Sequence, residues 1–260
     1  MTRLFGTDGI RGAANVDLRP SLAFALGRAT AHQVVGVGGS LVIGQDTRRS
    51  GDMFVAAITA GATSMGADVH HVGVVPTPAL AFLAGAGHFG AGIMVSASHN
   101  PAEDNGLKVL DPSGQKLPDD AEDELEALVL RADELPGVAP AGIGRAVDAS
   151  ELLDRYVADR LRLAERIGAA GIHVVLDAAN GAAYRVGPAI LRATGARVTV
   201  IHDAPDGDNI NRGCGATDPA SLAEAVRAHG ADVGFALDGD ADRCVAVDGQ
   251  GRLVDGDQAL

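Results

Sequence analysis

The sequence predicts an α/β protein of two consecutive domains, each with a mixed, mostly parallel sheet and flanking helices. Short apolar runs of strand length alternate with longer runs in which apolar residues have helical spacing, the repeating unit of a parallel sheet. This alternation occurs twice, before and after a segment rich in Pro, Gly and Ala at residues 136–144. The 35 glycines fall largely at turns between apolar runs, as tight strand-to-helix corners require.

The first predicted domain covers residues 1–148. It contains a buried strand, a polar turn, a helix and a second strand, in the order of a parallel sheet unit. A later strand leads directly into a serine-containing loop, and an acidic amphipathic helix follows that loop. The predicted strands are 41–44, 69–75 and 93–96, and the predicted helices are 53–65 and 121–132.

The second predicted domain covers residues 149–256. Ser150 is a predicted N-cap for a helix that runs to about residue 167. The pattern of the first domain then recurs at a distance too long for a solenoid repeat, which favours two similar domains. The predicted strands are 173–176, 197–201 and 232–237, and the predicted helices are 184–194 and 219–228.

Composition excludes several classes of function. The net charge of −13 argues against nucleic-acid binding, which depends on neutralising phosphates, and an anionic substrate would need a local basic cluster. Cys214 and Cys244 lack C-x-x-C spacing, so we expect neither a disulfide framework nor a zinc site, and a reducing cytoplasm fits best. Residues 69–102 carry no charged side chain, but their prolines and glycines argue against a membrane span and for deep burial.

The strongest chemical signal is the run Asp238-Gly239-Asp240-Ala241-Asp242-Arg243, which follows an apolar strand. Three carboxylates at alternate positions can converge on one hard cation, and oxygen ligands favour magnesium or calcium. An EF-hand requires Glu at its twelfth position, where this chain has Gly249, so the calcium-loop reading fails. The alternative is an exposed acidic turn without a metal.

Three further segments carry candidate residues. Ser98 and His99 lie at the end of a buried strand, where sites form in parallel sheets, although a serine needs activation to react. Arg11, among glycines in the run FGTDGIRG (5–12), could contact phosphate through two hydrogen bonds. Lys108, the first basic residue after the uncharged stretch, could pair with phosphate or donate a proton. Each segment alone is also compatible with an ordinary turn.

Together these segments resemble the α-D-phosphohexomutase family. The runs FGTDGIRG (5–12), SASHNP (96–101), DNGLK (104–108) and DGDADR (238–243) stand in that family's order and roughly its spacing. The similarity extends to VVLDAANGAA (174–183), GATD (215–218) and DGDQ (255–258), and so covers essentially the whole chain. The first two runs are most similar to the members that act on glucosamine phosphates.

The resemblance implies a mechanism. Ser98 would be a phosphoserine, primed by a sugar 1,6-bisphosphate or by autophosphorylation, and Mg²⁺ would be held by Ser98, Asp238, Asp240 and Asp242. Glucosamine 6-phosphate and glucosamine 1-phosphate would interconvert through a 1,6-bisphosphate. Arg243, Arg11 and Lys108 would bind phosphate. Lys108, ranked before His99, would move the proton, and Arg11 would assist catalysis.

The sequence departs from the family in two respects. Ala241 stands where many members have glycine, and we expect little effect because all three carboxylates remain. The family has four domains, of which this sequence would contain the first two and, at residues 257–260, the start of a third. We therefore expect the chain alone to bind magnesium and carry phosphate, but to isomerise sugar phosphates poorly.

Alternative substrates and alternative functions are also considered for this sequence. Within the family, glucose or mannose phosphates are alternative substrates. In a haloacid-dehalogenase-type phosphatase Asp238 would be the nucleophile, but that class has Thr or Val where this chain has Asp242, and the serine loop would be unexplained. A third alternative is a non-catalytic, metal-binding piece. The sequence gives no signal for an oligomeric state.

Overall fold

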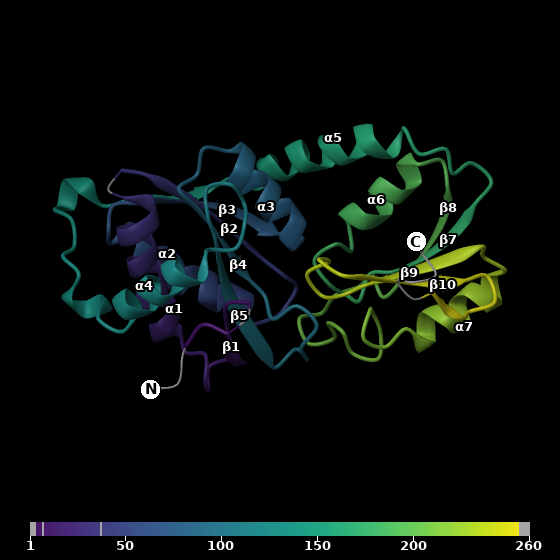
Figure 1. Ribbon diagram of the computed structural model, residues 1–260, viewed down its shortest axis with the longest axis horizontal. Coiled ribbons are helices and arrows are strands. Elements are labelled where there is room, and N and C mark those ends of the chain that lie inside the picture. Colours follow the sequence, from purple (N-terminus) through teal and green to yellow (C-terminus); the bar gives the residue numbers. More distant parts are fainter. Residues whose placement is uncertain (1–3, 7, 37, 255–260) are drawn as a thin grey trace. The chain divides into compact units, whose positions relative to one another are not determined.

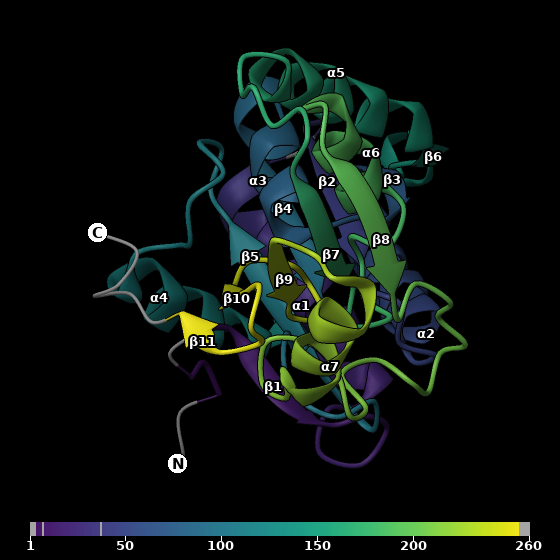
Figure 2. The same ribbon diagram turned by 90° about the vertical axis from the view of Figure 1, so that its right-hand side faces the viewer.

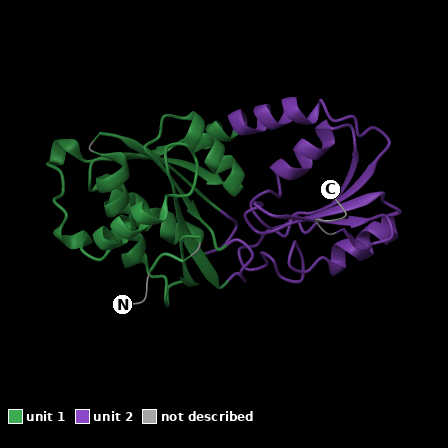
Figure 3. Ribbon diagram, in the orientation of Figure 1, with its two compact units in different colours: residues 1–45, 50–97, 103–153 green, residues 46–49, 98–102, 154–260 purple. Residues whose placement is uncertain are grey.

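The structure, a computed structural model, describes residues 4–6, 8–36 and 38–254. The chain forms two compact units (Figure 3). Unit 1 contains residues 1–45, 50–97 and 103–153, and unit 2 contains residues 46–49, 98–102 and 154–260. Two short segments that follow strands of unit 1 in the sequence are therefore part of unit 2.

Unit 1 is built on a six-stranded mixed sheet in the order β1-β5-β4-β2-β3-β6 (Figure 1). Strands β4, β2, β3 and β6 are parallel to one another. Strand β5 is antiparallel to both of its neighbours, β4 and β1. The carboxyl ends of β2 and β4 therefore lie at the same edge of the sheet, the edge at which α/β proteins place their sites. The strands are β1 Ile10–Ala13, β2 Ser40–Gln45, β3 Asp68–Val74, β4 Ala91–Val95, β5 Asp104–Leu110 and β6 Ala146–Asp148.

Helices cover both faces of this sheet. Helices α1, α2 and α4 share a buried cluster with Ile43 and Ile93 on one face. Helix α3 covers the other face, where a Cβ at Gly92 would contact Ala84. The helices are α1 Pro20–Thr30, α2 Gly51–Thr63, α3 Thr77–Ala86 and α4 Asp119–Val129, with short turns η1 Ala31–Val35, η2 Ala132–Glu134, η3 Pro140–Gly142 and η4 Ser150–Leu152.

Unit 2 is built on a five-stranded mixed sheet in the order β11-β10-β9-β7-β8 (Figure 2). Strands β9, β7 and β8 are parallel, and β10 is antiparallel to β9 and β11. Helix α7 packs on the face that carries Val175 and Ala236, and α6 packs on the face that carries Leu176 and Leu237. The elements are α5 Leu153–Ala164, β7 His173–Asp177, α6 Val186–Ala193, β8 Arg197–Ile201, α7 Ala220–His229, β9 Val233–Leu237, β10 Cys244–Asp248 and β11 Leu253–Val254.

The predicted α/β fold with two mixed-sheet domains is confirmed, and each predicted strand and helix is present, the strand at 197–201 with the predicted bounds and the others with shifted ends. The N-cap prediction for Ser150 is wrong. Ser150 begins a short 3-10 turn in which its N–H donates to the Asp148 carboxylate, and α5 starts only at Leu153 and ends at Ala164. The expected linker at 136–144 does not end the first unit, because it leads into β6, which pairs with β3.

The uncharged stretch 69–102 is folded into β3, α3 and β4, and most of it is buried. None of the described helices is long and apolar enough to cross a membrane. The domain boundaries expected at residues 148 and 256 stay predictions. The expected stub at 257–260 and the run at 255–258 lie outside the described residues.

Candidate functional site

Ser98 and Asp238 are in direct contact within unit 2. The Ser98 hydroxyl donates a hydrogen bond of 2.6 Å to Oδ2 of Asp238, and both side chains are buried. Ser98 has a φ of +52°, in the left-handed region that non-glycine residues rarely adopt. Such a conformation is stable only where surrounding contacts impose it, and it often marks a functional turn.

Two side chains impose this turn. Arg48 donates from Nη2 to the carbonyl oxygens of Ser98, at 3.0 Å, and Asn100, at 2.9 Å, and from Nη1 to that of Pro101. Asn211 donates from Nδ2 to the same two carbonyls of Ser98 and Asn100, at 2.9 and 3.0 Å. The loop backbone is therefore held by donors from two separate segments of unit 2.

Arg48 is itself fixed by a buried ion pair. Its Nε lies 2.9 Å from Oδ2 of Asp46, and neither side chain is exposed to solvent. Asp46 also accepts the backbone N–H of Arg48 at 2.9 Å. We predicted only a polar turn here, and the sequence signal that could have found the pair is two opposite charges directly after a buried strand. Asn211 has no comparable signal in its local sequence.

The aspartate loop, residues 238–243, follows strand β9. Its turn is closed by a hydrogen bond from the Ala241 N–H to the Asp238 carbonyl at 3.0 Å, with Ala241 at a φ of +58°. The carboxylates of Asp238, Asp240 and Asp242 offer oxygen atoms within 4.8 Å of one another; the first two residues are buried and the third is exposed. A set of only hard oxygen donors, gathered in this way, fits Mg²⁺.

Glycine at position 239 allows the aspartate loop and the serine loop to approach. A Cβ there would lie 2.6 Å from the carbonyl oxygen of Ser98, closer than non-bonded atoms allow. The Gly239 carbonyl in turn accepts the backbone N–H of Ala182 at 2.7 Å. The two loops therefore meet through backbone as well as through the Ser98 and Asp238 side chains.

Arg243 joins the same group. Its guanidinium lies 3.0 Å from Oδ2 of Asp238 and 3.5 Å from Oδ1 of Asp242. It also donates to the Ser98 hydroxyl and to Nδ1 of His99. Because the Arg243 side chain is about half exposed, at 48%, its guanidinium can contact both this cluster and an anion from solvent. The structure thus brings together the predicted residues Ser98, His99, Asp238, Asp240, Asp242 and Arg243.

Arg11 and Lys108 form a separate group in unit 1, around Asp8. Arg11 lies on β1, which pairs with β5, the strand that carries Lys108. Asp8 binds Lys108 Nζ through Oδ1 at 2.6 Å and Arg11 Nη2 through Oδ2 at 2.7 Å. Burial alone would raise the pKa of Asp8, but the hydrogen bonds and positive charges of Lys108 and Arg11 outweigh it and lower that pKa.

Asp8 was not among the predicted site residues, although it lies inside the run FGTDGIRG. The available signal was one acid placed three residues before an arginine in a glycine-rich segment. Arg11 also donates from Nη1 to the carbonyl of Ala97 at 3.4 Å, directly before the serine loop in sequence. Lys108, for which a surface turn was one alternative, is instead on a central strand of the sheet.

Comparison with known proteins identifies the family of both units. The family described as phosphoglucomutase/phosphomannomutase, alpha/beta/alpha domain I, matches residues 2–136, and domain II of the same family matches residues 154–251. The phosphoglucosamine mutase of Desulforudis audaxviator is 53% identical over 266 residues, which cover 100% of this chain. The chain spans 58% of the length of that relative.

Solved structures show the same fold. A phosphoglucomutase/phosphomannomutase family protein from Burkholderia thailandensis superimposes with a TM-score of 0.82 at 28% identity, covering 98% of this chain and 56% of that one. The Aspergillus fumigatus N-acetylphosphoglucosamine mutase, solved with GlcNAc-6P and magnesium, gives a TM-score of 0.52 at 20% identity, covering 98% and 52%. At this lower identity the likeness concerns the fold alone.

Proposed function

Because this chain belongs to the phosphoglucomutase/phosphomannomutase family, we propose that it provides the phosphate-carrying serine and the metal loop of a phosphoglucosamine mutase. The reaction interconverts glucosamine 6-phosphate and glucosamine 1-phosphate through a 1,6-bisphosphate. The observation that carries the proposal is the contact of Ser98 Oγ with Asp238 Oδ2 at 2.6 Å, beside Arg243. The choice of glucosamine over glucose or mannose rests on the relatives named phosphoglucosamine mutase.

Ser98 Oγ is the atom that accepts and returns the phosphoryl group. When it accepts the group, a P–O bond to Oγ forms and the bond from phosphorus to the sugar oxygen breaks; Oγ gives up one proton, and the departing sugar oxygen takes up one proton to become a hydroxyl. When it donates, the same exchange runs in reverse. Phosphoryl transfer depends on alignment and charge stabilisation more than on covalent help from the protein. Arg48 and Asn211 supply alignment by fixing the backbone carbonyls around Ser98.

Charge stabilisation would come from Arg243 and from a cation held by the carboxylates. Asp238, Asp240 and Asp242, together with Ser98, would hold Mg²⁺, which neutralises charge on the phosphoryl oxygens when bound. The Arg243 guanidinium, already in contact with Ser98 and Asp238, pairs with the phosphoryl oxygens on Ser98. His99, which contacts the same guanidinium, helps to orient it.

Proton transfer to and from the sugar hydroxyl is assigned to Lys108, with His99 as the second candidate. The ion pair with Asp8 fixes the position of the Lys108 ammonium, and the same carboxylate holds Arg11. Arg11 contacts substrate phosphate, since its guanidinium keeps donors beyond those used by Asp8 and Ala97. We further propose that the protein works in the cytoplasm, where its two free cysteines stay reduced.

A single-turnover measurement tests this proposal. The chain is loaded with labelled phosphate from a sugar 1,6-bisphosphate in Mg²⁺, and label transfer to glucosamine 6-phosphate is compared with transfer to glucose and mannose phosphates. Ser98→Ala should abolish loading, and Ser96→Ala, the other serine of the loop, should retain it. Loading that survives in Ser98→Ala would overturn the proposal. Equal transfer to all three sugars would overturn the assignment of glucosamine.

A further inference from the structure

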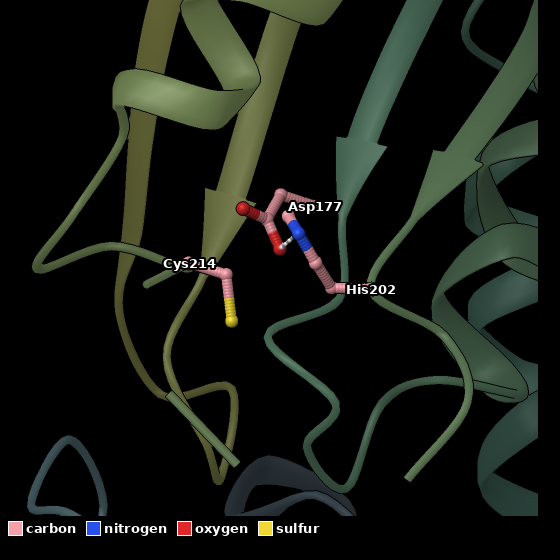
Figure 4. Close-up of side chains that lie close together, drawn as sticks. All are labelled: Asp177, His202 and Cys214. Carbon is pink, nitrogen blue, oxygen red and sulfur yellow. Dashed lines mark ion pairs between the residues drawn. The ribbon is translucent and has the colours of Figure 1, made fainter. Parts of the chain in front are cut away.

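A second group of metal-ligating side chains lies in unit 2, outside the aspartate loop (Figure 4). Asp177 is the last residue of β7, His202 directly follows β8, and Cys214 lies in the loop before α7. Because β7 and β8 are parallel neighbours, with Asp177 opposite Ile201, their carboxyl ends meet at one edge. The ligand atoms of the three side chains lie within 4.8 Å of one another.

Each of the three residues is held in place by its surroundings. The Asp177 carboxylate accepts the backbone N–H of Ala179 at 2.9 Å through Oδ1 and that of Gly215 at 2.8 Å through Oδ2. The second of these bonds ties Asp177 to the residue that follows Cys214, whose side chain is fully buried. His202 takes a left-handed φ of +51°, which is unusual for a residue other than glycine.

One ring nitrogen of His202 is buried without a hydrogen bond to the described residues. Its Nδ1 is buried and lies 3.1 Å from Oδ1 of Asp177, close enough for an ion pair. The geometry at this nitrogen is nevertheless not that of a hydrogen bond, and no other described residue supplies one. A buried polar atom without a hydrogen bond carries a cost, and coordination to a cation is one way to remove it.

From this geometry we propose that Asp177, His202 and Cys214 form a site for a divalent transition metal, of which Zn²⁺ is the best fit. A thiolate and an imidazole favour Zn²⁺, whereas an all-oxygen set such as the aspartate loop favours Mg²⁺. Three protein ligands leave a fourth tetrahedral position for water. Cysteine spacing had argued against zinc, but that rule detects only sites built from local motifs and not one assembled from three separate segments.

Metal binding at this site requires loss of the Cys214 proton. Burial, and secondarily the nearby carboxylates of Asp177 and Asp218, raise the pKa of the Cys214 thiol to about 12. A metal must therefore displace this proton into solvent, so the affinity should increase with pH.

Backbone hydrogen bonds connect this site to the aspartate loop. The turn that follows Asp177 donates the Ala182 N–H to the carbonyl of Gly239, and the loop that follows Cys214 donates the Ala216 N–H to the carbonyl of Leu237, at 2.7 and 2.9 Å. Both acceptors lie within two residues of Asp238. A metal that joins the two donor segments would therefore rigidify the backbone on which the aspartate loop rests, a structural role.

Cobalt titration tests the site directly, because Co²⁺ bound to a thiolate gives a ligand-to-metal charge-transfer absorption that an all-oxygen site does not. The reduced chain is titrated with Co²⁺ in excess Mg²⁺, and Zn²⁺ is then added to displace the cobalt. We expect the charge-transfer band in the wild-type chain and in Cys244→Ser, which removes the other thiol. Cys214→Ser should lack the band, and His202→Asn should weaken Co²⁺ binding more than about tenfold, since even changes around a metal's ligands cost about 10–100-fold.

Absence of the band in the wild-type chain, or its loss in Cys244→Ser, would overturn the proposal. Should Cys214→Ser fold poorly, the Cys244→Ser chain provides the same test, because the sequence has two cysteines and a charge-transfer band in this variant can come only from the Cys214 thiolate. The Asp240→Asn variant should keep the cobalt band even though it disrupts the aspartate loop. The cobalt band tests metal binding at Asp177, His202 and Cys214, whereas phosphate loading tests the proposed chemistry at Ser98. A negative result in one experiment is therefore independent of the other.

Discussion

Ser98 and Asp238, which are 140 positions apart in the sequence, are joined by a hydrogen bond of 2.6 Å between two buried side chains. This contact links the serine loop, which carries the proposed phosphate acceptor, to the aspartate loop, which carries the proposed magnesium ligands. Arg243 contacts both residues. The Ser98 hydroxyl, the Asp238 carboxylate and the Arg243 guanidinium are therefore already in contact within unit 2, so the proposed phosphoryl transfer would need little reorganisation of these groups.

Removal of the Arg48 side chain should destabilise unit 2 strongly. In Arg48→Met the buried Asp46 carboxylate loses its ion-pair partner, and breaking such a pair costs about 3–5 kcal/mol. Urea denaturation measures the change. Arg49→Met is the matched control, because the pair of Arg49 with Asp208 is solvent-exposed and should change stability little. Equal effects of the two variants would contradict the role assigned to Arg48.

A side chain at position 239 should separate the serine and aspartate loops. Gly239→Ala places a Cβ 2.6 Å from the Ser98 carbonyl oxygen, so the loops must move apart and Mg²⁺ affinity should fall. Isothermal titration with Mg²⁺ measures this. The neighbouring change Ala241→Gly relieves a left-handed alanine and should leave Mg²⁺ affinity unchanged or slightly higher. Unchanged affinity in Gly239→Ala would be inconsistent with the close approach of the loops.

The three aspartates should contribute unequally to metal binding. Asp240 is buried, so Asp240→Asn removes a carboxylate charge that solvent cannot replace, and Mg²⁺ affinity should drop by more than about tenfold. Asp242 is exposed, and water can substitute for part of its role, so Asp242→Asn should cost less. A larger loss for Asp242→Asn than for Asp240→Asn in the same titration would reverse the assigned order.

Asp8 should make the stability of unit 1 depend on acid pH. Its pKa in the folded chain lies below the ordinary 3.8, so its stabilisation is present above that pH and is lost as the pH falls through the lowered value. Asp8→Asn should therefore be less stable than wild type at pH 7, and the difference should shrink in acid below about pH 4. Thermal unfolding at a series of pH values measures it, and a pH-independent difference would refute the pairing.

The two thiols should differ in reactivity. Cys214 is fully buried and its thiol pKa is raised to about 12 by burial first and by Asp177 and Asp218 second, whereas Cys244 is exposed. A thiol reagent should modify only Cys244 in the native chain and both cysteines after unfolding, as counted by mass spectrometry. Rapid native modification of Cys214 would show that its surroundings open to solvent.

The sequence predicted strands β2, β3, β4, β7, β8 and β9, helices α2, α4, α5, α6 and α7, and the candidate site residues, because those signals are local. Strands β1, β5, β10 and β11 and helix α1 were not predicted. Ser98 and the three aspartates lie in short runs directly after apolar strands, and such runs can be recognised in the sequence without knowledge of the fold. Helix α3 was missed because its residues are apolar all round, so no helical period is visible against the buried strands beside it. β6 was missed because three residues of mixed polarity give too short a pattern.

The residues that support the site could not be predicted, because their roles arise from contacts between distant segments. Arg48 and Asn211 are far apart in the sequence, yet both donate to the carbonyls of Ser98 and Asn100 in the serine loop. Asp8 acquires its role only when β1 pairs with β5 and places Lys108 beside it. The group of Asp177, His202 and Cys214 likewise exists only once β7 and β8 are parallel neighbours.

The central claim is that Ser98 carries phosphate, and phosphopeptide mapping tests it most directly. The chain is incubated with a sugar 1,6-bisphosphate and Mg²⁺, its intact mass is measured, and the modified peptide is sequenced after acid treatment. We expect one acid-stable phosphate, located on Ser98. Phosphate that is lost in acid, as an acyl phosphate on Asp238 would be, or a chain that stays unmodified under these conditions, would show that Ser98 does not carry phosphate.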